Sequence, residues 1–475
     1  MHLCFFLRCF IENYAMIPNC MSETERQRKT EDSLLTHGDY RKKIIRFMFP
    51  ILIGQLFQQM YNTADALIVG NYLDAESLAA VTSTSSLVFL IIGFCLGFSS
   101  GAGVVVSRHI GAGDEKKTSK AVHTSVASGI VISILTTGIG VLFADDMLRL
   151  MGTPENIIFR AVLYLRIYFG GSFSVVMYNM LVGIVQASGD SKHPLIYLVI
   201  SSLLNIVLDL ILISVFHMGV EGAAIATVIS QTFSMILVLR QLLSAKDATK
   251  LILSEISFDG DNLSSILRYG FPSAMQNCVV DLSNVLIQSY INSFGSDAVA
   301  GIGASIRAEG FAFLLVTAFS IAVTTFVSQN IGAGAYVRAK KGAWFSLITS
   351  VVLIEAIGLF MFAAAPQIIS LFSRSPSVIG FGTGRMRICG PFYCLVGFSH
   401  VASALMRGAG RPNVPLVVML GCWCAVRVAV LTLIGGMIHD IRLVFWIYPV
   451  TWALSTIVYI WFLKTTKIGT ESLIG

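Results

Sequence analysis

The sequence predicts an all-α polytopic membrane protein with twelve transmembrane helices in two repeated six-helix bundles. Composition is the first observation behind this prediction: 55% of the 475 residues are hydrophobic, only 13% are charged, and the mean hydropathy is +0.76. So apolar a chain cannot face water over most of its surface, which must therefore face lipid. The net charge of +6 is spread over short loops, without the continuous basic face that binds nucleic acid.

An internal repeat is the second observation. Phe49-Pro50 recurs as Phe271-Pro272, RHIGAGDEKK (108–117) as QNIGAGAYVR (329–338), and QASGDSKHP (186–194) as RGAGRPNVP (407–415). The offset is 222 residues at the proline (272 − 50) and 221 at the loops (329 − 108). Six spans in each half give both halves the same orientation, so we expect a pseudo-twofold axis along the membrane normal and a cavity between the halves.

The individual spans follow from the length that a helix needs to cross the hydrocarbon core, roughly 20 mainly apolar residues. Twelve stretches of the sequence satisfy this requirement. They run approximately over 44–70, 78–104, 120–143, 160–187, 194–215, 220–240, 264–291, 299–328, 341–363, 384–406, 414–435 and 442–463.

The distribution of positive charge predicts the orientation. Lys and Arg concentrate in the loops after the even spans and between the halves, and the turns NYLDAES, FHMGV and NSFGSDA contain none. Both termini should therefore lie in the cytoplasm. The predicted domains are a disordered cytoplasmic tail (1–43), an N-terminal lobe (44–243), a cytoplasmic linker (244–263), a C-terminal lobe (264–463) and a short cytoplasmic tail (464–475).

The chain ends and the cysteines give few further signals. The apolar run of MHLCFFLRCF is short and interrupted by Arg8, which argues against a cleaved signal peptide. Translation could start at Met1 or at Met21. The cysteines after residue 20 lie in or beside apolar spans and form no CxxC pair, so we expect neither disulfides nor structural zinc.

Polar side chains form a stripe along the first span and another along the seventh. Residues three and four apart share one helical face, so each stripe should face protein or water and could line a substrate cavity. The alternative is that the amides hydrogen-bond between helices and hold them together. The stripes consist of Gln55, Gln58, Asn62 and Asp65, and of Asn277, Asp281, Asn284 and Gln288.

Charged residues within the spans are candidate functional groups, because each costs between about 2.5 and 17 kcal/mol near the bilayer centre. On the fifth span, Asn205 and Asp209 lie one above the other at i and i+4. A carboxylate beside an amide oxygen suits Na⁺, whereas a carboxylate removed from water suits a proton, and the spacing fits both. The candidates are Asp65, Asp209, Asp281, Arg307, Glu309, Glu355 and Arg427.

Two enzyme-like patterns have simpler explanations. The IGAG loops lack the Lys-Ser/Thr pair of a phosphate-binding loop, so tight cytoplasmic turns are expected. An intramembrane aspartyl protease would carry GxGD within a span, but the nearest string, ASGD ending at Asp190, lies in a basic loop. We therefore expect a protein that is not an enzyme and carries no cofactor.

Together these residues resemble the multidrug and toxic compound extrusion (MATE) transporters, specifically their DinF-like prokaryotic branch. The resemblance covers about residues 40 to 465. It rests on the paired halves, on Pro50 fifteen residues before Asp65 in YNTADALIVG, and on the IGAG, QASGDSKHP and NIVLD motifs. It implies a V-shaped pair of six-helix bundles in the plasma membrane that works as a monomer. The implied activity is export of amphipathic, often cationic drugs, including antibiotics, in exchange for Na⁺ or H⁺.

The resemblance also implies residue roles. Pro50 matches the proline at which the first helix bends, although it could instead be a helix-initiating proline. Asp281 and Glu309 are expected as secondary proton or substrate groups or as structural pairs, and Arg307 could pair with Glu309. The implied cation site lies in the N-terminal lobe and consists of Asp65, Asn179, Asn205, Asp209 and Thr227.

The main alternative is a flippase for lipid-linked oligosaccharides from a related branch. Such a protein would need a cationic cavity for phosphate headgroups, whereas the polar stripes here are amide and acidic. An exporter is therefore favoured. The repeat also breaks at the ion site, because Asn205 and Asp209 align with Val426 and Val430 at the offset of 221, so that the site belongs to one lobe.

Overall fold

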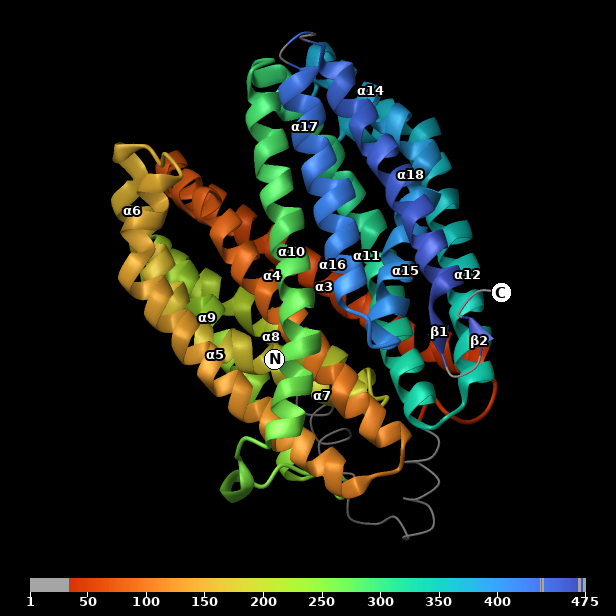
Figure 1. Ribbon diagram of the computed structural model, residues 1–475. Helices are drawn as coiled ribbons and strands as arrows, with labels where there is room; N and C mark the ends of the chain where they lie inside the picture. Colours follow the sequence, from red (N-terminus) through yellow and green to blue (C-terminus); the bar gives the residue numbers. More distant parts are fainter. Residues whose placement is uncertain (1–33, 436, 438–439, 469–470, 473–475) are drawn as a thin grey trace.

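The computed structural model describes residues 34–435, 437, 440–468 and 471–472, and these residues are almost entirely helical. They form two helical bundles that lie side by side (Figure 1). The first bundle contains α3 (Tyr40–Tyr72), α4 (Ala75–Gly111), α5 (Glu115–Leu150), α6 (Glu155–Gly170), α7 (Ser172–Ala187), α8 (Lys192–Asp209), η1 (Leu210–Val215) and α9 (Val220–Leu243).

The second bundle follows a linker that carries the short helix η2 (Leu253–Glu255). Two short antiparallel strands, β1 (Lys467–Ile468) and β2 (Glu471–Ser472), follow the last helix of the second bundle. The second bundle contains α10 (Gly260–Asn292), α11 (Ser296–Gly332), α12 (Tyr336–Ala363), α13 (Ala365–Ser370), α14 (Pro376–Cys389), η3 (Gly390–Phe392), α15 (Tyr393–Gly408), α16 (Asn413–Val418), η4 (Met419–Ala425), α17 (Val426–Leu433) and α18 (Ile441–Thr465).

The prediction of an all-helical membrane protein is confirmed, while the number twelve remains a prediction. Among the described residues, nine helical segments are long and apolar enough to cross a membrane, and the bent pair α6 and α7 would make a tenth. Helices α3 and α10 are 33 residues long but are not among these segments. These are the two helices that carry the polar stripes.

Several helices begin at an aspartate whose carboxylate accepts a backbone N–H of the first turn, which satisfies a donor that the helix leaves free. Asp39, Asp74, Asp114, Asp259 and Asp440 do this for α3, α4, α5, α10 and α18. Helix α3 therefore starts ten residues before Pro50 (50 − 40), so that Pro50 lies inside the helix. It is not a helix-initiating proline.

The IGAG loops are helix C-terminal turns, as the sequence predicts. Gly113 and Gly334 adopt φ of +68° and +69°, the left-handed conformation that glycine enters without steric cost. In each turn the next residue closes the helix: the Asp114 N–H donates to the His109 carbonyl, and the Ala335 N–H donates to the Asn330 carbonyl. We call the end of the molecule that carries these two turns the IGAG end.

At the IGAG end the two bundles pack closely through α3, α4, α10 and α11. The Arg108 Nη2 atom donates to the Gly408 carbonyl at 3.1 Å, and the Gln329 Nε2 atom donates to the Ala187 carbonyl at 2.7 Å. The two donors, Arg108 and Gln329, are 221 residues apart in the sequence, and so are the two acceptors, Ala187 and Gly408 (329 − 108; 408 − 187). The two bonds are thus one contact repeated about the pseudo-twofold axis.

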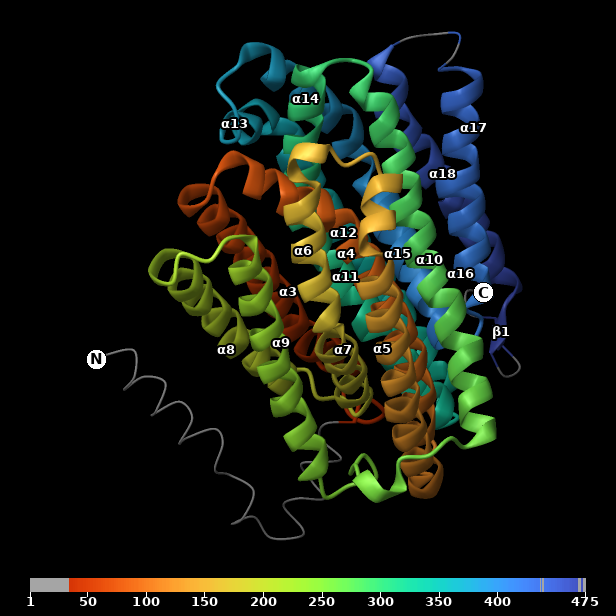
Figure 2. The same ribbon diagram turned by 90° about the vertical axis from the view of Figure 1, so that its left-hand side faces the viewer.

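At the opposite end the bundles diverge, with α6 and α17 far apart in Figure 1, and the arrangement is V-shaped. Turning the molecule by 90° brings the first bundle to the front, with the second behind and above it (Figure 2).

The predicted disordered tail needs a correction at its end. Its first 33 residues lie outside the described part of the chain, but residues 34–39 are packed against the second bundle and α3 already begins at Tyr40. The Leu35 N–H donates to Gln329 Oε1 at 2.9 Å, and Arg338 donates to the carbonyls of Leu35, His37 and Gly38. These bonds satisfy backbone groups that would otherwise lose water on burial, which is why this segment is ordered.

Candidate functional site

The strongest candidate site lies where α3 packs against the end of α8. Asp65 projects from α3 and Asp209 is the last residue of α8, and their carboxyl groups lie close enough to interact electrostatically. Asp209 is fully buried. In the described structure no donor reaches either oxygen of Asp209 or the Oδ1 atom of Asp65. Ionised carboxylates only accept hydrogen bonds, so this pair needs a proton or a cation between its oxygens.

The local backbone supports this placement. Immediately after Asp209 the chain leaves the α-helical pattern for the π-helical segment η1. Such segments are rare and are often found at functional sites. Because a π-helical turn is wider than an α-helical turn, the side chains after Asp209 point in other directions than a regular α-helix would give them.

Asn205 on α8 and Thr227 on α9, two further predicted site residues, lie together in a neighbouring pocket. Asn205 is buried, and neither its Nδ2 atom nor its Oδ1 atom has a hydrogen-bond partner in the described structure. The Thr227 hydroxyl donates to the Ala223 carbonyl at 3.0 Å, so its oxygen can still accept or coordinate. Asn205 and Thr227 line a common pocket.

Asn179 is the one predicted member for which the structure gives no contact with this group. Its amide donates to the Val175 carbonyl of its own helix at 2.8 Å, and its backbone carbonyl accepts from the Ser99 hydroxyl at 2.6 Å. Asn179 therefore joins α7 to α4 in this conformation.

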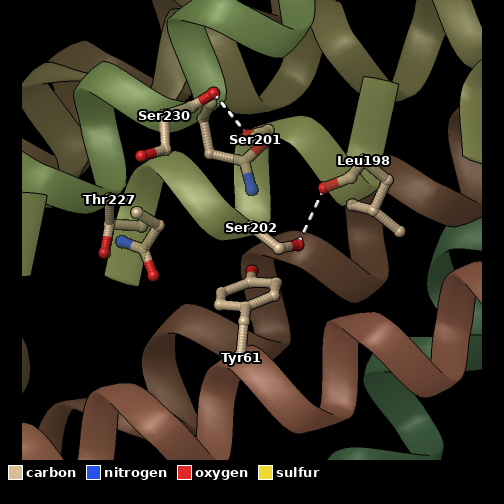
Figure 3. Close-up of a pocket in the computed structure, with 8 residues that line it drawn as sticks. Tyr61, Leu198, Ser201, Ser202, Thr227 and Ser230 are labelled. Atoms are coloured by element: carbon tan, nitrogen blue, oxygen red, sulfur yellow. Dashed lines mark hydrogen bonds between the residues drawn. The ribbon is translucent and has the colours of Figure 1, made fainter. Parts of the chain in front are cut away.

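The pocket beside Asn205 is formed by α3, α8 and α9, and Figure 3 shows its side chains. About 220 Å³ at this place is not filled by protein atoms, and this volume includes open solvent. In Figure 3 the Tyr61 ring points from α3 toward Ser202 on α8. The pocket is lined by Tyr61, Leu198, Ser201, Ser202, Asn205, Thr227, Ser230 and Gln231.

Sequence reasoning missed most of these neighbours, although their spacing is a usable signal. Tyr61 precedes Asp65 by four residues, Ser201 precedes Asn205 by four, and Gln231 follows Thr227 by four, so each shares a helical face with a predicted residue. Tyr164 on α6 gave no such signal, because only the tertiary fold brings it close to both aspartates.

The polar stripe of α3 is only partly hidden. Gln55 and Gln58 are half-buried, and Asn62 is exposed. The stripe therefore leads from an accessible face of the helix toward the carboxyl pair.

The stripe of α10 divides differently. The Asn277 amide donates to the Gly93 carbonyl of α4 at 2.7 Å and so joins the two bundles, which is the packing role that the sequence left open. Asn284 is exposed, and Gln288 donates to Asn292 in the same helix at 2.9 Å. The side chain of Asp281 lies outside the described part of the structure.

Glu309 pairs with Arg385, and the considered pair with Arg307 does not form. The Arg385 Nη1 atom lies 2.8 Å from Glu309 Oε1, both side chains are almost fully buried, and the Tyr393 hydroxyl donates to the same oxygen at 2.6 Å. Arg307 is exposed, since residues two apart on a helix point in different directions.

Two further charged residues have structural partners. The Glu355 carboxylate accepts the backbone N–H of Cys394 at 2.8 Å, at the start of α15. The buried Arg427 guanidinium stacks on the rings of Trp423 and Tyr448, and its Nε atom donates to Thr451 at 3.1 Å. Cation–π contact of this kind compensates part of the cost of burying the charge.

The chain is similar to known proteins over nearly its whole length. The family model MatE matches residues 50–211 and 272–433, which are the two repeated halves. The probable multidrug resistance protein YoeA of Bacillus subtilis is 30% identical over 442 residues, covering 90% of this chain and 95% of YoeA.

Two other similar proteins extend the comparison. An FAD transporter of Shewanella oneidensis is 25% identical over 420 residues, covering 86% of this chain and 91% of that protein. A solved structure of a multidrug resistance MATE family transporter in an outward-facing conformation has a TM-score of 0.83 at 25% identity and covers 90% of this chain and 96% of that one.

Proposed function

Because the chain belongs to the MatE family of multidrug and toxic compound extrusion transporters, we propose that it exports amphipathic, cationic compounds in exchange for Na⁺ or H⁺. The observation that carries this proposal is the carboxyl pair of Asp65 and Asp209, in which Asp209 is fully buried and, within the described structure, no donor reaches either Asp209 oxygen or Asp65 Oδ1. Asn205, one helical turn before Asp209, and Thr227 offer neutral oxygens in the neighbouring pocket. The transporter needs no cofactor and acts as a monomer.

Coupling follows from the different electrostatics of the filled and empty pair. Without a cation or proton the two carboxylates repel each other, which favours separation of α3 from α8. With a positive charge between them the helices are held together. A cation drives substrate release only because it binds the two conformations with different affinity.

The orientation of the protein in the plasma membrane gives this exchange its direction. We place the IGAG end in the cytoplasm, because the basic loops gather there. Substrate enters from the cytoplasm or the inner leaflet, and the cation enters from outside. Both chain termini are cytoplasmic in this arrangement.

The substrate class follows from the accessible polar residues. The exposed part of the α3 stripe carries amides and leads to acidic groups, which suits a cationic, amphipathic molecule. A flippase for lipid-linked oligosaccharides is not favoured, since its phosphate cargo would meet two carboxylates and no Lys or Arg occurs in residues 50–72.

Efflux of a fluorescent lipophilic cation from cells that lack other exporters tests the proposal. Asp65→Asn and Asp209→Asn should each abolish cation-driven efflux while the proteins reach the membrane in normal amounts. Asp297→Asn is the matched control, because this aspartate is exposed in the first turn of α11, at the end of that helix opposite its IGAG turn. Wild-type efflux in either site variant would refute the role of the pair.

A further inference from the structure

The pocket beside Asn205 lies on one particular side of the carboxyl pair. The Ala187 carbonyl, just before α8, binds Gln329 at the IGAG end, so α8 runs away from that end. Ser201 precedes Asn205 by one turn and Asp209 by two turns. The pocket is thus displaced from the carboxyl pair toward the IGAG end.

The serine and threonine hydroxyls that line the pocket can act only as acceptors, while the Tyr61 phenol and the amides of Asn205 and Gln231 also carry hydrogens. Ser202, Thr227 and Ser230 donate their single hydrogens to the carbonyls of Leu198, Ala223 and Ala226 at 2.8 to 3.0 Å. Ser201 donates to the Ser230 carbonyl at 2.7 Å. Since a hydroxyl has one hydrogen and two lone pairs, each of these oxygens retains only acceptor capacity.

The charge around the pocket has one sign. No Lys or Arg lines the pocket. The helices around it also lack both residues over 50–72, 194–215 and 220–239. Tyr61, which lines the pocket, lies close to the carboxyl groups of Asp65 and Asp209. Acceptor oxygens in a negative field favour a small cation over an anion or an apolar group.

The pocket ends at an apolar contact. Leu198 is its lining residue nearest the IGAG end, and its side chain packs at Gly54 of α3, where an added Cβ atom would lie 3.5 Å from it. Beyond it, α9 carries the buried Ser234, whose hydroxyl has no partner in the described structure. Leu198 is therefore the apolar residue at this end of the pocket, and Ser234 is a further polar group of α9 toward the IGAG end.

We propose that this pocket is a transfer site, where a small monovalent cation, Na⁺ or hydronium, rests between leaving the carboxyl pair and being released at the IGAG end. Leu198 closes the site on that side. The inference rests on the proposed cation exchange, and it adds the release route and the residues Ser201, Ser202, Ser230 and Leu198.

Exchange in proteoliposomes separates this role from packing. The test variant is the pair Ser202→Ala and Ser230→Ala. The control pair is Ser125→Ala and Ser128→Ala, two buried serines of α5 that make the same bond to the carbonyl four residues earlier. Ethidium exchange is driven by a Na⁺ gradient at equal pH, or by a pH gradient in choline buffer, and the two arms distinguish the cations.

We expect the test pair to lower the maximal exchange rate about tenfold, because the loss of one or two polar contacts to the cation changes an equilibrium or a rate by about this factor. Ethidium affinity should stay unchanged and the control pair should match the wild type. Exchange at the control rate, or an equal loss of ethidium binding, would overturn the transfer site. If neither gradient changed the rate of ethidium exchange by the wild-type protein, the proposed function would be refuted, and the transfer site with it.

A gain of function gives a second test that misfolding cannot mimic. Leu198→Ser should open the pocket toward the IGAG end and let the driving cation leak without ethidium. Leu203→Ser, on an exposed position of the same helix, should not leak. Equal leaks in the two variants would contradict the assignment of Leu198.

Discussion

At the scale of single residues, both carboxylate oxygens of Asp209 and the Oδ1 atom of Asp65 are buried without a hydrogen-bond partner in the described structure. A cation that binds between them stabilises the folded protein by mass action, about 2.7 kcal/mol at a concentration of 100 Kd. Asp209→Asn supplies an amide N–H to Asp65 and removes one charge. The variant should therefore lose the increase in melting temperature that Na⁺ or acidification gives the wild type, as measured in detergent.

Asp297→Asn should keep the full cation-dependent increase, because this exposed aspartate lies in the other bundle. If Asp209→Asn retained it as well, the cation would bind elsewhere.

Glu309 gives a different prediction, because it already has partners. Glu309→Gln would leave the Arg385 guanidinium buried beside a neutral group, which typically costs about 3 to 5 kcal/mol. We expect a large fall in melting temperature. The double variant Glu309→Leu with Arg385→Met removes both charges and should recover most of the loss. A single variant as stable as the wild type would show that the pair is not buried.

Charge and helical spacing, which are local properties, single out Asp65, Asn205 and Asp209 in the sequence, whereas Thr227 is predicted from the resemblance. The sequence could not identify Arg385 as the partner of Glu309, since these residues meet only when α11 packs on α14. For the same reason Tyr164 was missed and Asn179 was assigned to the site from the resemblance alone.

At the scale of elements, hydropathy predicts where most helices lie but not how they are interrupted. The bend of 46° between α6 and α7 occurs at Gly171, where a Cβ atom would meet Val228 Cγ2 at 2.3 Å. The π-helical segments η1 and η4 lie within the fifth and eleventh spans, where hydropathy does not mark them. Such breaks depend on contacts with neighbouring helices, which the pattern of one span does not encode.

Asp190 at the start of α8 provides a pH-dependent test of one element. Partial burial raises the pKa of its carboxyl, but bonds from the His193 ring and from the N–H groups of His193 and Lys192 lower it more. With a folded pKa below the unfolded value, near 4, its stabilisation is present above about pH 4 and is lost as pH falls through the folded pKa.

Asp190→Asn should thus lower the free energy of unfolding by about 1 to 2 kcal/mol at neutral pH, with the difference from the wild type shrinking below about pH 4. Melting temperatures between pH 3 and 7 measure it. A difference that stays constant down to pH 3 would show that the charge of Asp190 does not contribute.

At the scale of the whole molecule, close glycine contacts hold the bundles together at the IGAG end. A Cβ atom on Gly332 would lie 2.1 Å from the Arg108 carbonyl oxygen, and one on Gly111 would lie 2.0 Å from that of Gln329. Gly332→Val should force α4 and α11 apart there. If the bundles rock as rigid bodies, the opposite ends should approach each other.

Spin labels at Leu150→Cys and Leu371→Cys report this movement, because both positions are highly exposed and lie in different bundles. Gly310→Val is the control, since nothing lies within 4 Å of a Cβ atom there. We expect a shorter label distance only in Gly332→Val, and an unchanged distance would contradict rigid rocking about this contact.

The two bundles share their turns and their contact at the IGAG end, but they differ where charge is buried. The first bundle places Asp209 on its fifth span, where the second has Val430 and, nearby, Arg427. The repeat thus explains the architecture, while the carboxyl pair of one bundle explains how a cation gradient could drive it.

Exchange by the purified protein in proteoliposomes, under Na⁺ and H⁺ gradients imposed one at a time, tests this central claim most directly. The account predicts that one of the gradients drives uptake of a lipophilic cation by the wild type, and that neither drives it in Asp65→Asn or Asp209→Asn. Gradient-driven uptake that persists in both variants would contradict it.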